Sequence, residues 1–409
     1  MRLTFHTAGE SHGQALVALV EGAPAGLPLL AAHVDHELAR RQQGYGRGRR
    51  MVIETDKVEF IAGVRAGETI GAPIAMMIRN KDWKNWEAIM DPAPRPEDDT
   101  PEGRKRQVTR VRPGHADLTG LLKYDREDAR DVLERASARE TTARVAAGAV
   151  AKRLLAEFGV RIGSHLVHLG GVDAVAPAVM PEDINAAADA SQLRCLDAQA
   201  EAAMIERIDA AKAEGNTLGG ICEVVVTGLP VGLGSHVSWD RKLDGRLAAA
   251  ICSIPAVKGV EMGIGFLAAR LTGAQVHDEI EPAPGNPRTG HVKRRTNRAG
   301  GLEGGMTTGE PLVLRVAMKP ISTLMRPLNT VDVRTGEKAD AAAERSDVTA
   351  VPAMGVIAEA LVAFVLADAM VEKFGGDSLA EMRRNVEGYL AAAGRRWADL
   401  RQPQGPEAE

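Results

Sequence analysis

The chain contains few aromatic residues and few cysteines. Phe, Tyr and Trp make up only 3% of its 409 residues, whereas glycine occurs 43 times. We therefore expect close backbone packing and glycine-shaped loops rather than a core filled by large rings. The three cysteines, Cys195, Cys222 and Cys252, show no C-x-x-C spacing. This pattern predicts a reducing compartment and argues against a disulfide framework and a zinc site, so we expect no metal.

Long hydrophobic runs are also scarce. The sequence starts without the apolar core of a signal peptide. The most apolar stretch, residues 356–374, is interrupted by Glu359, Asp368, Glu372 and Lys373. These charges favour a helix buried in a soluble protein over a membrane span. We accordingly expect a cytoplasmic protein with no membrane partner.

Two common nucleotide-binding motifs are missing. There is no G-x-G-x-x-G run after a predicted strand and no Walker A loop, so a nucleotide-like cofactor would bind outside a Rossmann unit. The net charge of −4 argues against a general nucleic-acid binder. Arginines nevertheless cluster locally, as in proteins that attract an anionic small molecule.

The stretch at residues 110–158 is the most informative part of the chain. It opens with Arg112-Pro-Gly-His-Ala-Asp117, in which proline and glycine prevent a helix. The loop places His115 between an arginine and an aspartate.

A predicted helix follows this loop. Ser137 and Glu140 have the spacing of a capping box, and an apolar stripe continues until Gly159 ends the helix. Arg135 and Arg139 stand beside the helix N-terminus, where free N–H groups favour anions. We interpret this as an anion site, although a capped surface helix with solvated arginines has the same pattern.

Gly9-Glu-Ser-His-Gly13 fits the G-x-S-x-G pattern of a hydrolase nucleophile elbow. An elbow lies on a strand-to-helix turn with an oxyanion loop earlier in the chain, but here eight residues precede the motif and a second strand-like run follows. Ser11 and His12 would also be sequence neighbours, which rarely lets one deprotonate the other. We favour a loop that presents both to a ligand, and a serine hydrolase using Ser11 is the alternative.

A second cationic loop, Gly44-Tyr-Gly-Arg-Gly-Arg-Arg-Met51, follows a predicted helix at 34–41. Alternate glycines let the backbone approach a ligand, and Arg41, Arg47, Arg49 and Arg50 surround that point. The alternative is a basic turn or a phosphate- or RNA-binding module using residues 40–50. One short patch is weak support for RNA binding.

The remaining elements are predicted from hydrophobic periodicity. Strands are expected at 3–5, 15–20, 58–64, 73–78, 160–170, 221–227, 260–266 and 312–318, and further helices at 198–213 and 243–251. His165 and His168 are expected to be structural. The strand–helix–strand order of the second half hints at an internal duplication. We expect residues 81–107 to form a mobile lid or a disordered insertion. We expect a basic glycine-rich loop at 285–305 and a poorly ordered tail after residue 393.

Seven motifs together resemble those of the chorismate synthase family, and they occur in that family's order. They are Gly9-Glu-Ser-His-Gly13, Gly44-Tyr-Gly-Arg-Gly48, Arg112-Pro-Gly-His-Ala-Asp117, Arg135-Ala-Ser-Ala-Arg-Glu-Thr141, Asn297-Arg-Ala-Gly-Gly-Leu-Glu-Gly-Gly305, Lys319-Pro-Ile-Ser-Thr323 and Arg345-Ser-Asp-Val348. Each motif alone is weak, but seven in order are specific. Departures lie outside the motifs, in the charged loop at 91–107 and in the tail.

The resemblance implies a lyase that converts 5-enolpyruvylshikimate-3-phosphate to chorismate and phosphate, the last step of the shikimate pathway, by a 1,4-anti elimination that needs reduced FMN. It implies that His12 protonates the departing phosphate, His115 protonates or stabilises the reduced flavin, and Asp347 assists proton removal through flavin N5. The candidate flavin contacts are Arg135, Ala136, Ser137, Pro255, Ala256, Gly304, Lys319, Pro320, Ile321, Ser322, Thr323 and Arg345. The candidate substrate contacts are Ser11, Arg41, Arg47, Arg50, Arg112 and Arg139.

Elementary chemistry agrees with these implied roles. Phosphate leaves more easily when it is protonated and held by arginines. A reduced flavin can donate electron density to the allylic system and receive it back, so no net oxidant is needed. NADPH is a candidate reductant, and the resemblance leaves open whether this chain or a separate flavin reductase uses it.

The fold implied by the resemblance is α+β, a β-α-β sandwich with helices packed between antiparallel sheets. One domain would span residues 1–392, followed by a flexible tail at 393–409, and the assembly would be a homotetramer. A helix that is apolar all round, as at 356–374, is typical of one covered on both faces. No nucleic-acid partner is expected.

Overall fold

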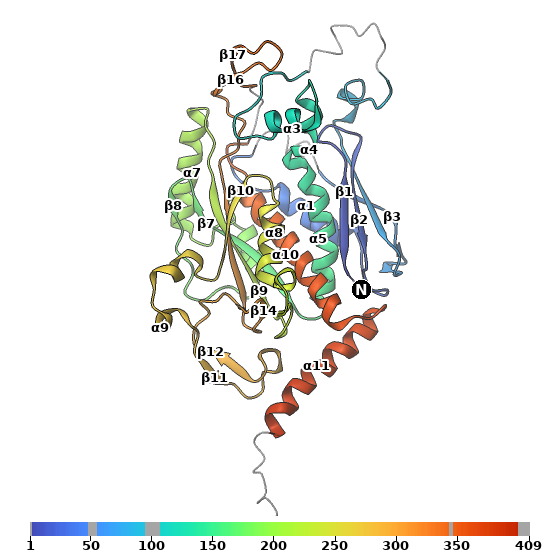
Figure 1. Cartoon of the computed structure of the whole chain (residues 1–409), viewed down its shortest axis with the longest axis vertical. Helices are drawn as coiled ribbons and strands as arrows, with labels where there is room; N and C mark the ends of the chain where they lie inside the picture. The colour runs from blue at the N-terminus through green and yellow to red at the C-terminus, as the bar shows by residue number, and fades with distance from the viewer. Residues whose placement is uncertain (1, 48–54, 95–106, 343–346, 400–409) are drawn as a thin grey trace, which may run out of the picture.

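Helices lie between two antiparallel sheets in the computed structural model, which describes residues 2–47, 55–94, 107–342 and 347–399 (Figure 1). This is the expected α+β sandwich. Each sheet turns one apolar face inward onto the helices, as a layered architecture requires.

The four-stranded sheet has the order β1-β2-β6-β3. Its strands are β1 (Thr4–Ala8), β2 (Ala15–Glu21), β6 (Ile74–Arg79) and β3 (Val58–Ala62). Alternate residues of β2 and β6 face each other, with Leu16 opposite Ile78 and Ala18 opposite Met76. All four side chains are fully buried, so the period of two in the sequence places one face of this sheet in the core.

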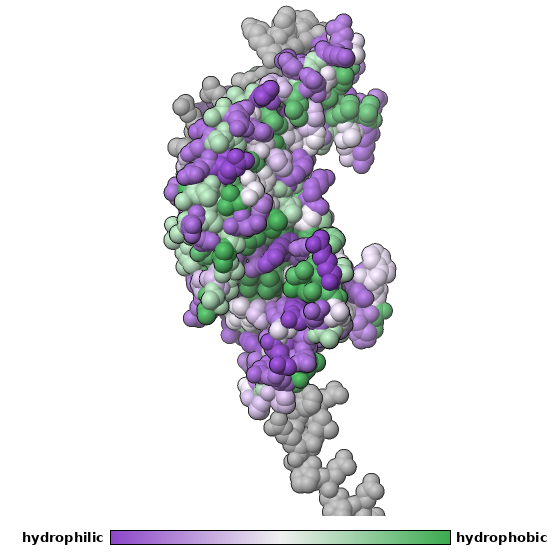
Figure 2. All heavy atoms as spheres, turned by 90° about the vertical axis from the view of Figure 1, so that its left-hand side faces the viewer, coloured by the Kyte–Doolittle hydropathy of each residue, from purple (hydrophilic) through white to green (hydrophobic). Residues whose placement is uncertain are grey.

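The five-stranded sheet has the order β10-β15-β9-β7-β8. Its strands are β10 (Val257–Met262), β15 (Leu312–Met318), β9 (Gly220–Thr227), β7 (Arg161–Leu169) and β8 (Val172–Asp173). Leu314 of β15 pairs with Val224 of β9, and both are fully buried. The outer side of the molecule next to this sheet and α7 (Ala198–Ala213) mixes hydrophobic with hydrophilic residues (Figure 2).

Four helices form the middle layer, namely α1 (Ala31–Gln42), α5 (Thr141–Ala156), α8 (Leu243–Cys252) and α10 (Val351–Phe374). α10 is long and apolar enough to span a membrane, but 94% of its most apolar window is buried inside the protein, as expected for a core helix. α5 and α10 pack against each other. A Cβ on Gly148 would lie 2.3 Å from that of Ala360, so this contact depends on glycine.

A buried ionic network crosses the middle layer. The Glu359 carboxylate on α10 accepts bonds from both Arg40 terminal nitrogens at 2.9 and 3.0 Å, from Arg194 at 3.0 Å and from Lys152 at 2.6 Å. Burial alone would raise the pKa of Glu359, but the surrounding cations hold it well below its usual range. The network therefore ties α1, α5 and α10 together through charge.

The remaining elements lie around this sandwich. The further helices are α3 (Asp117–Tyr124), α4 (Arg130–Ala136), α6 (Ile184–Asp189), α9 (Gly273–Val276) and α11 (Leu379–Asp399), with short 3₁₀ helices at Trp83–Asn85, Ala138–Glu140, Trp239–Arg241, Gly265–Arg270 and Pro287–Thr289. The small hairpins are β4 (Val64–Arg65) with β5 (Glu68–Thr69), β11 (Ile280–Pro282) with β12 (Val292–Arg294), β13 (Leu302–Glu303) with β14 (Met306–Thr307), and β16 (Asn329–Val331) with β17 (Lys338–Asp340).

Several sequence expectations need correction. The strand expected at 260–266 is β10 at Val257–Met262, since Gly263 and Gly265 adopt positive φ and a 3₁₀ helix follows. The loop expected at 285–305 contains β12 and most of the β13–β14 hairpin. The tail does not begin at residue 393, because α11 continues to Asp399. Residues 95–106 and 400–409 lie outside the described part of the chain.

The capping box expected before α5 is also wrong. Ser137 caps a single 3₁₀ turn, where its hydroxyl accepts from the Arg139 backbone N–H at 3.2 Å. The Glu140 carboxylate instead accepts from the Thr7 hydroxyl at 2.9 Å and from Arg144. Glu140 therefore does not close the expected box, and α5 begins at Thr141, after the 3₁₀ turn rather than directly after Ser137.

Candidate active site

The Gly9–Gly13 segment connects the antiparallel strands β1 and β2 as a hairpin loop. Gly9 has φ +105°, and a Cβ there would lie 2.4 Å from the Ala15 carbonyl oxygen, so only glycine fits. A nucleophile elbow requires a helix after the serine. The hairpin therefore argues against the hydrolase alternative and favours a loop that presents Ser11 and His12.

His12 is held by a carboxylate from a distant part of the chain. Its ring Nδ1 lies 2.9 and 3.0 Å from the two oxygens of Glu134 on α4, and its backbone N–H donates to the same carboxylate at 2.9 Å. Burial would raise the pKa of Glu134, but the hydrogen bonds from His12 and the charge of Arg130 lower it. The carboxylate therefore remains ionised beside the imidazole.

An indole ring covers the same histidine. The Trp86 ring stacks on His12 with centroids 3.7 Å apart and planes 23° apart. The Arg130 guanidinium lies 5.1 Å from the centroid of Trp86 and donates to Glu134 at 2.8 Å. His12 is thus enclosed by α4 and by the segment that follows β6.

Ser11 and two of the expected flavin contacts also meet at this loop. The Ser137 hydroxyl donates to Ser11 Oγ at 3.1 Å, and the Ser11 N–H donates to the Glu134 carbonyl at 3.0 Å. Arg135 donates to the carbonyl oxygens of Thr7 at 2.8 Å and Gly9 at 3.0 Å. Ala136, the last residue of α4, lies between these two residues in the chain.

The arginines expected to bind substrate anions have defined protein partners. Arg139 donates to Asp56 at 2.7 Å and to the Asn80 side chain at 2.8 and 3.0 Å. Arg41 donates to the Thr141 hydroxyl and the Ala138 carbonyl, both at 3.0 Å. Arg40 and Arg41 are both buried, so they do not form the exposed basic turn that an RNA-binding module would need.

His115 lies in a second carboxylate-centred group. Its Nδ1 contacts Asp117, which also binds Arg112 through Nε at 2.8 Å and Nη2 at 3.1 Å. Arg112 extends this group by donating to the Thr323 hydroxyl at 3.0 Å. Burial would raise the pKa of Asp117, but hydrogen bonds from His115 and Arg112 hold it well below its usual range.

The Lys319–Thr323 segment lies directly against the loop of His115. The Ser322 hydroxyl donates to the Gly114 carbonyl at 2.9 Å, and the Lys319 ammonium lies 3.0 Å from Ser322 Oγ. Burial, followed by the charge of Lys258, lowers the pKa of Lys319. Within this segment, Pro320 follows Lys319, and Ile321 accepts a hydrogen bond from Thr217 at 2.8 Å through its carbonyl.

Ala256 joins the same group. Its carbonyl accepts from the Lys319 N–H at 2.9 Å, and it follows Pro255 directly after α8. Its φ of +67° is in the left-handed region, which costs a residue with a side chain free energy and often marks a functional position.

Asp347 pairs with Arg47, whose Nε lies 2.9 Å from the carboxylate. Next to it, the Val348 N–H donates to the Gly46 carbonyl, and the Val348 carbonyl accepts from Leu218. The neighbouring Thr217 donates to the Ile321 carbonyl, which links the segment that carries Asp347 to the Lys319–Thr323 segment. Arg50 and Arg345 lie outside the described residues.

The structure does not place every expected contact together. Gly304 lies in the turn between β13 and β14, and its neighbour Gly305 accepts from the N–H of Leu243 at the start of α8. Pro255 and Ala256 lie beyond the other end of this ten-residue helix, which is about 15 Å long. Within one chain, Gly304 is therefore separated from the other candidate flavin contacts.

The similarity of this chain to known proteins extends over the residues described above. A model of the chorismate synthase family matches residues 3–371. The chain is 57% identical over 395 residues to chorismate synthase from Symbiobacterium thermophilum, covering 96% of this chain and 100% of that protein. It is 56% identical over 386 residues to the Bacillus cytotoxicus protein of the same name, covering 94% and 98%. The chain belongs to the chorismate synthase family.

A solved structure supports this assignment at the level of the fold. A crystal structure of chorismate synthase superposes with a TM-score of 0.77 at 40% identity, covering 97% of this chain and 99% of that one. Since nearly the whole of both chains is covered, the sandwich described above is the chorismate synthase fold.

Several residues in this site were not predicted from the sequence. Two residues hold His12, namely Glu134 and Trp86, and two hold Arg139, namely Asn80 and Asp56. None of the four was among the candidates chosen from the motifs. Asp117 was noted only as a flank of His115. A buried carboxylate next to a histidine is a recurrent arrangement, but nothing in the spacing of 122 residues between His12 and Glu134 indicates that they meet.

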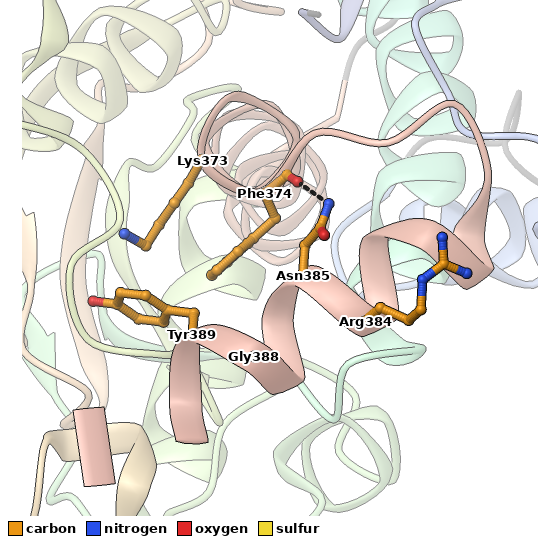
Figure 3. A pocket seen from close by; sticks show the side chains of 6 residues that line it. All are labelled: Lys373, Phe374, Arg384, Asn385, Gly388 and Tyr389. Carbon is orange, nitrogen blue, oxygen red and sulfur yellow. Dashed lines mark hydrogen bonds between the residues drawn. The ribbon is translucent and has the colours of Figure 1, made fainter. Parts of the chain in front are cut away.

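One pocket lies away from these groups, at the junction of α10 and α11 (Figure 3). It has a volume of about 390 Å³ and is lined by Lys373, Phe374, Arg384, Asn385, Gly388 and Tyr389. The Lys373 ammonium lies 3.9 Å above the Tyr389 ring, and Tyr389 donates to the Val231 carbonyl at 3.0 Å. Arg384 points away from this pair (Figure 3). These polar groups hold the helices together and do not converge on a ligand.

Proposed function

We propose that this chain converts 5-enolpyruvylshikimate-3-phosphate to chorismate and phosphate, as a carbon–oxygen lyase in the shikimate pathway. The observation that supports this most strongly is the pair of histidine–carboxylate groups, His12 with Glu134 and His115 with Asp117, set among arginines of chorismate synthase motifs. Two histidines with separate carboxylate partners suit two separate proton-handling roles.

The elimination removes one proton and one phosphate from the substrate. The C–O bond to phosphate breaks with its electron pair on the leaving oxygen, the C–H bond breaks with loss of a proton, and a new carbon–carbon double bond forms. Atoms and electrons balance without a net oxidant. His12 donates a proton to the departing phosphate, and Asp347 assists removal of the substrate proton.

Cationic residues bind and orient the anionic substrate. Arg41, Arg47 and Arg112 hold its phosphate and carboxylates, with Ser11, Arg50 and Arg139 as further contacts. Arg47 and Arg112 each bind a carboxylate of the protein, which keeps their guanidinium groups in fixed orientations. Positioned cations of this kind stabilise the negative charge that develops on a leaving phosphate.

The residues around Lys319 and Ser137 fit a flavin mononucleotide. The site offers hydroxyl groups, an ammonium group and the strained backbone at Ala256. These groups could bind the phosphate and the polar ring edge of the flavin. The flavin-binding residues are then Arg135, Ala136, Ser137, Pro255, Ala256, Gly304, Lys319, Pro320, Ile321, Ser322, Thr323 and Arg345. When bound, reduced FMN supplies electron density to the reacting allylic system and regains it. His115 holds a proton next to this cofactor.

An anaerobic assay tests the proposal directly. The substrate is incubated with the chain, with and without dithionite-reduced FMN, while chorismate absorbance and phosphate release are followed together. Equal amounts of both products, formed only with reduced flavin, are expected. Phosphate without chorismate would indicate a phosphatase that uses the same arginines, and absence of turnover would refute the proposal.

The same assay identifies the reductant. Oxidised FMN with NADPH replaces dithionite-reduced FMN, first with the chain alone and then with a separate flavin reductase added. Chorismate formation with the chain alone would assign the reduction to this protein, and formation only with the second enzyme would assign it to that partner.

We also propose a homotetramer in the cytoplasm. Large hydrophobic side chains remain exposed on one chain, including Trp239 at 85% and Phe266 at 77%, and exposed apolar groups of this size often lie in subunit contacts. A second copy could also supply the Gly304 turn that lies apart within one chain. Light scattering should give four times the chain mass of 43.4 kDa, and a monomer in solution would contradict the assembly.

A further inference from the structure

The His12 ring is held on two sides by residues that no motif contains. The Glu134 carboxylate lies on its Nδ1 edge at 2.9 and 3.0 Å, and the Trp86 ring covers one of its faces at 3.7 Å. An imidazole fixed at one nitrogen and across one face has little freedom to rotate about its side-chain bonds. The ring orientation is therefore set by α4 and by the segment after β6 rather than by the hairpin loop that carries it.

The carboxylate also determines where the exchangeable proton lies. An ionised carboxylate only accepts hydrogen bonds, and Glu134 is held ionised because hydrogen bonds and nearby charge outweigh its burial. A hydrogen must therefore reside on Nδ1 of His12. Proton exchange with a substrate is then assigned to the other ring nitrogen, Nε2.

Glu134 is itself held firmly in place. Besides the three contacts with the ring and backbone N–H of His12, its carboxylate accepts from Arg130 one helical turn earlier at 2.8 Å. Arg130 also lies 5.1 Å from the Trp86 ring centroid, so one cation supports both residues that hold the histidine. A side chain with its own partners can transmit a fixed geometry to a catalytic group.

We propose that Glu134 is a positioning residue for proton transfer by His12, with Trp86 holding the plane of the ring. This rests on the proposed function, since it presumes that His12 Nε2–H donates its proton to the phosphate oxygen as the C–O bond breaks. The proton then returns to Nε2 from solvent before the next turnover, while the hydrogen on Nδ1 remains in its bond to Glu134.

The test is a double-mutant cycle between Glu134→Gln and His12→Ala, measured with saturating reduced FMN. Glutamine keeps the size of the side chain but loses its charge and can offer an N–H to Nδ1. Glu134→Gln alone should lower kcat about 10- to 100-fold with a smaller change in KM, within the range for a perturbed acid. In the His12→Ala background the same change should lower kcat by less than about two-fold, because residues that act as a unit are not additive.

Glu140→Gln is the matched control. Glu140 is also a buried carboxylate that binds an arginine four residues away, but its other partners are the Thr7 hydroxyl and Arg135, at 3.6 Å, rather than a histidine. Its effect on kcat should be the same with and without His12. Equal multiplicative losses for Glu134→Gln in both backgrounds would overturn the proposal, because Glu134 would then act by another route.

A second variant guards against misfolding of the first. Trp86→Leu removes the ring that stacks on His12 and lies near Arg130, but it leaves in place every residue that bonds to Glu134. It should show the same non-additivity with His12→Ala on a smaller scale. Additive losses for Trp86→Leu would exclude its part in holding the ring. Full activity of His12→Ala alone would instead contradict the proposed role of His12, which distinguishes failure of the function from failure of this inference.

Discussion

The two histidine groups of this protein have the same chemistry but different construction. In both, a buried carboxylate contacts Nδ1 and also binds an arginine. The carboxylate of His115 comes from Asp117, two residues along the same loop, whereas that of His12 comes from Glu134, 122 residues away. One group is therefore a local loop structure, and the other exists only because α4 packs against the β1–β2 hairpin.

This difference predicts how each group responds to substitution of its residues and to acid. The His115 group is fastened to Arg112 and through it to Thr323, so its carboxylate mainly stabilises the fold around Arg112. The His12 group is fastened to Arg130 and covered by Trp86, so its surroundings mainly fix the orientation of one ring. Four predictions test this contrast.

The largest effects should come from the histidines themselves. His12→Ala and His115→Ala should each lower kcat by about 10²–10⁴, the usual range for a lost acid or base. His168→Ala is the control, because His168 forms a comparable pair with Asp173 at 2.7 Å at the exposed sheet edge and should stay within about two-fold. Steady-state kinetics under anaerobic conditions measures all three, and full activity of either catalytic variant would refute its role.

Removal of the local carboxylate should chiefly affect stability. Asp117→Ala leaves the buried Arg112 guanidinium without its main partner and should lower the free energy of unfolding by about 3–5 kcal/mol. Asp131→Ala provides the comparison, because the Asp131–Arg126 pair has the same spacing of five residues but lies on the surface. Its loss should cost less than about 1 kcal/mol. Urea unfolding checks both, and equal losses would show that burial does not distinguish the pairs.

Acid should weaken both groups. The pKa values of Asp117 and Glu134 are lower in the folded chain than in the unfolded one, so the unfolded chain binds more protons as pH falls. Their stabilisation is present above the ordinary carboxylate range near pH 4 and is lost below it, by up to about 1.4 kcal/mol per pH unit for each group.

Unfolding in urea at a series of pH values between 7 and 3 measures this loss. Asp117→Asn, which cannot titrate, should show a shallower decline in the free energy of unfolding than the natural chain. An unchanged slope would mean that Asp117 does not contribute to the acid sensitivity.

The smallest effect concerns the aromatic cover on His12. Trp86→Leu should lower stability by about 0.5–1.5 kcal/mol, the contribution of a stacked ring pair, and should leave the His115 group unaffected. Trp83→Leu is the control, because Trp83 lies in the same short segment but forms no ring contact in the described residues. Thermal unfolding of both variants measures the difference, and an equal loss in both would assign no role to the stack.

Hydrophobic periodicity predicted most strands of the two main sheets and the helices of the middle layer, but not α3, α4, α6 or α11. α7 and β15 have the expected boundaries, and α5 begins next to the expected cap, because amphipathic stripes and glycine stops act locally. The errors arose where tertiary contacts override local signals. Glu140 bonds to Thr7 in β1, and Ser137 caps a 3₁₀ turn instead of α5. α11 continues past the expected start of the tail, and its Asn385 side chain donates to the Phe374 carbonyl at the end of α10.

The sequence by itself determined the family through the order of its motifs, and the resemblance to that family implied the layered α+β class. The local loop that joins Arg112, His115 and Asp117 follows from short-range spacing. Only the tertiary structure decided that Glu134, Arg130 and Trp86 surround His12 and that Gly304 lies at the start of α8, at the opposite end from Pro255 and Ala256. The physical reason is distance along the chain. Contacts between segments far apart in the chain are set by how the sheets and helices pack, and no local pattern in the sequence encodes that packing.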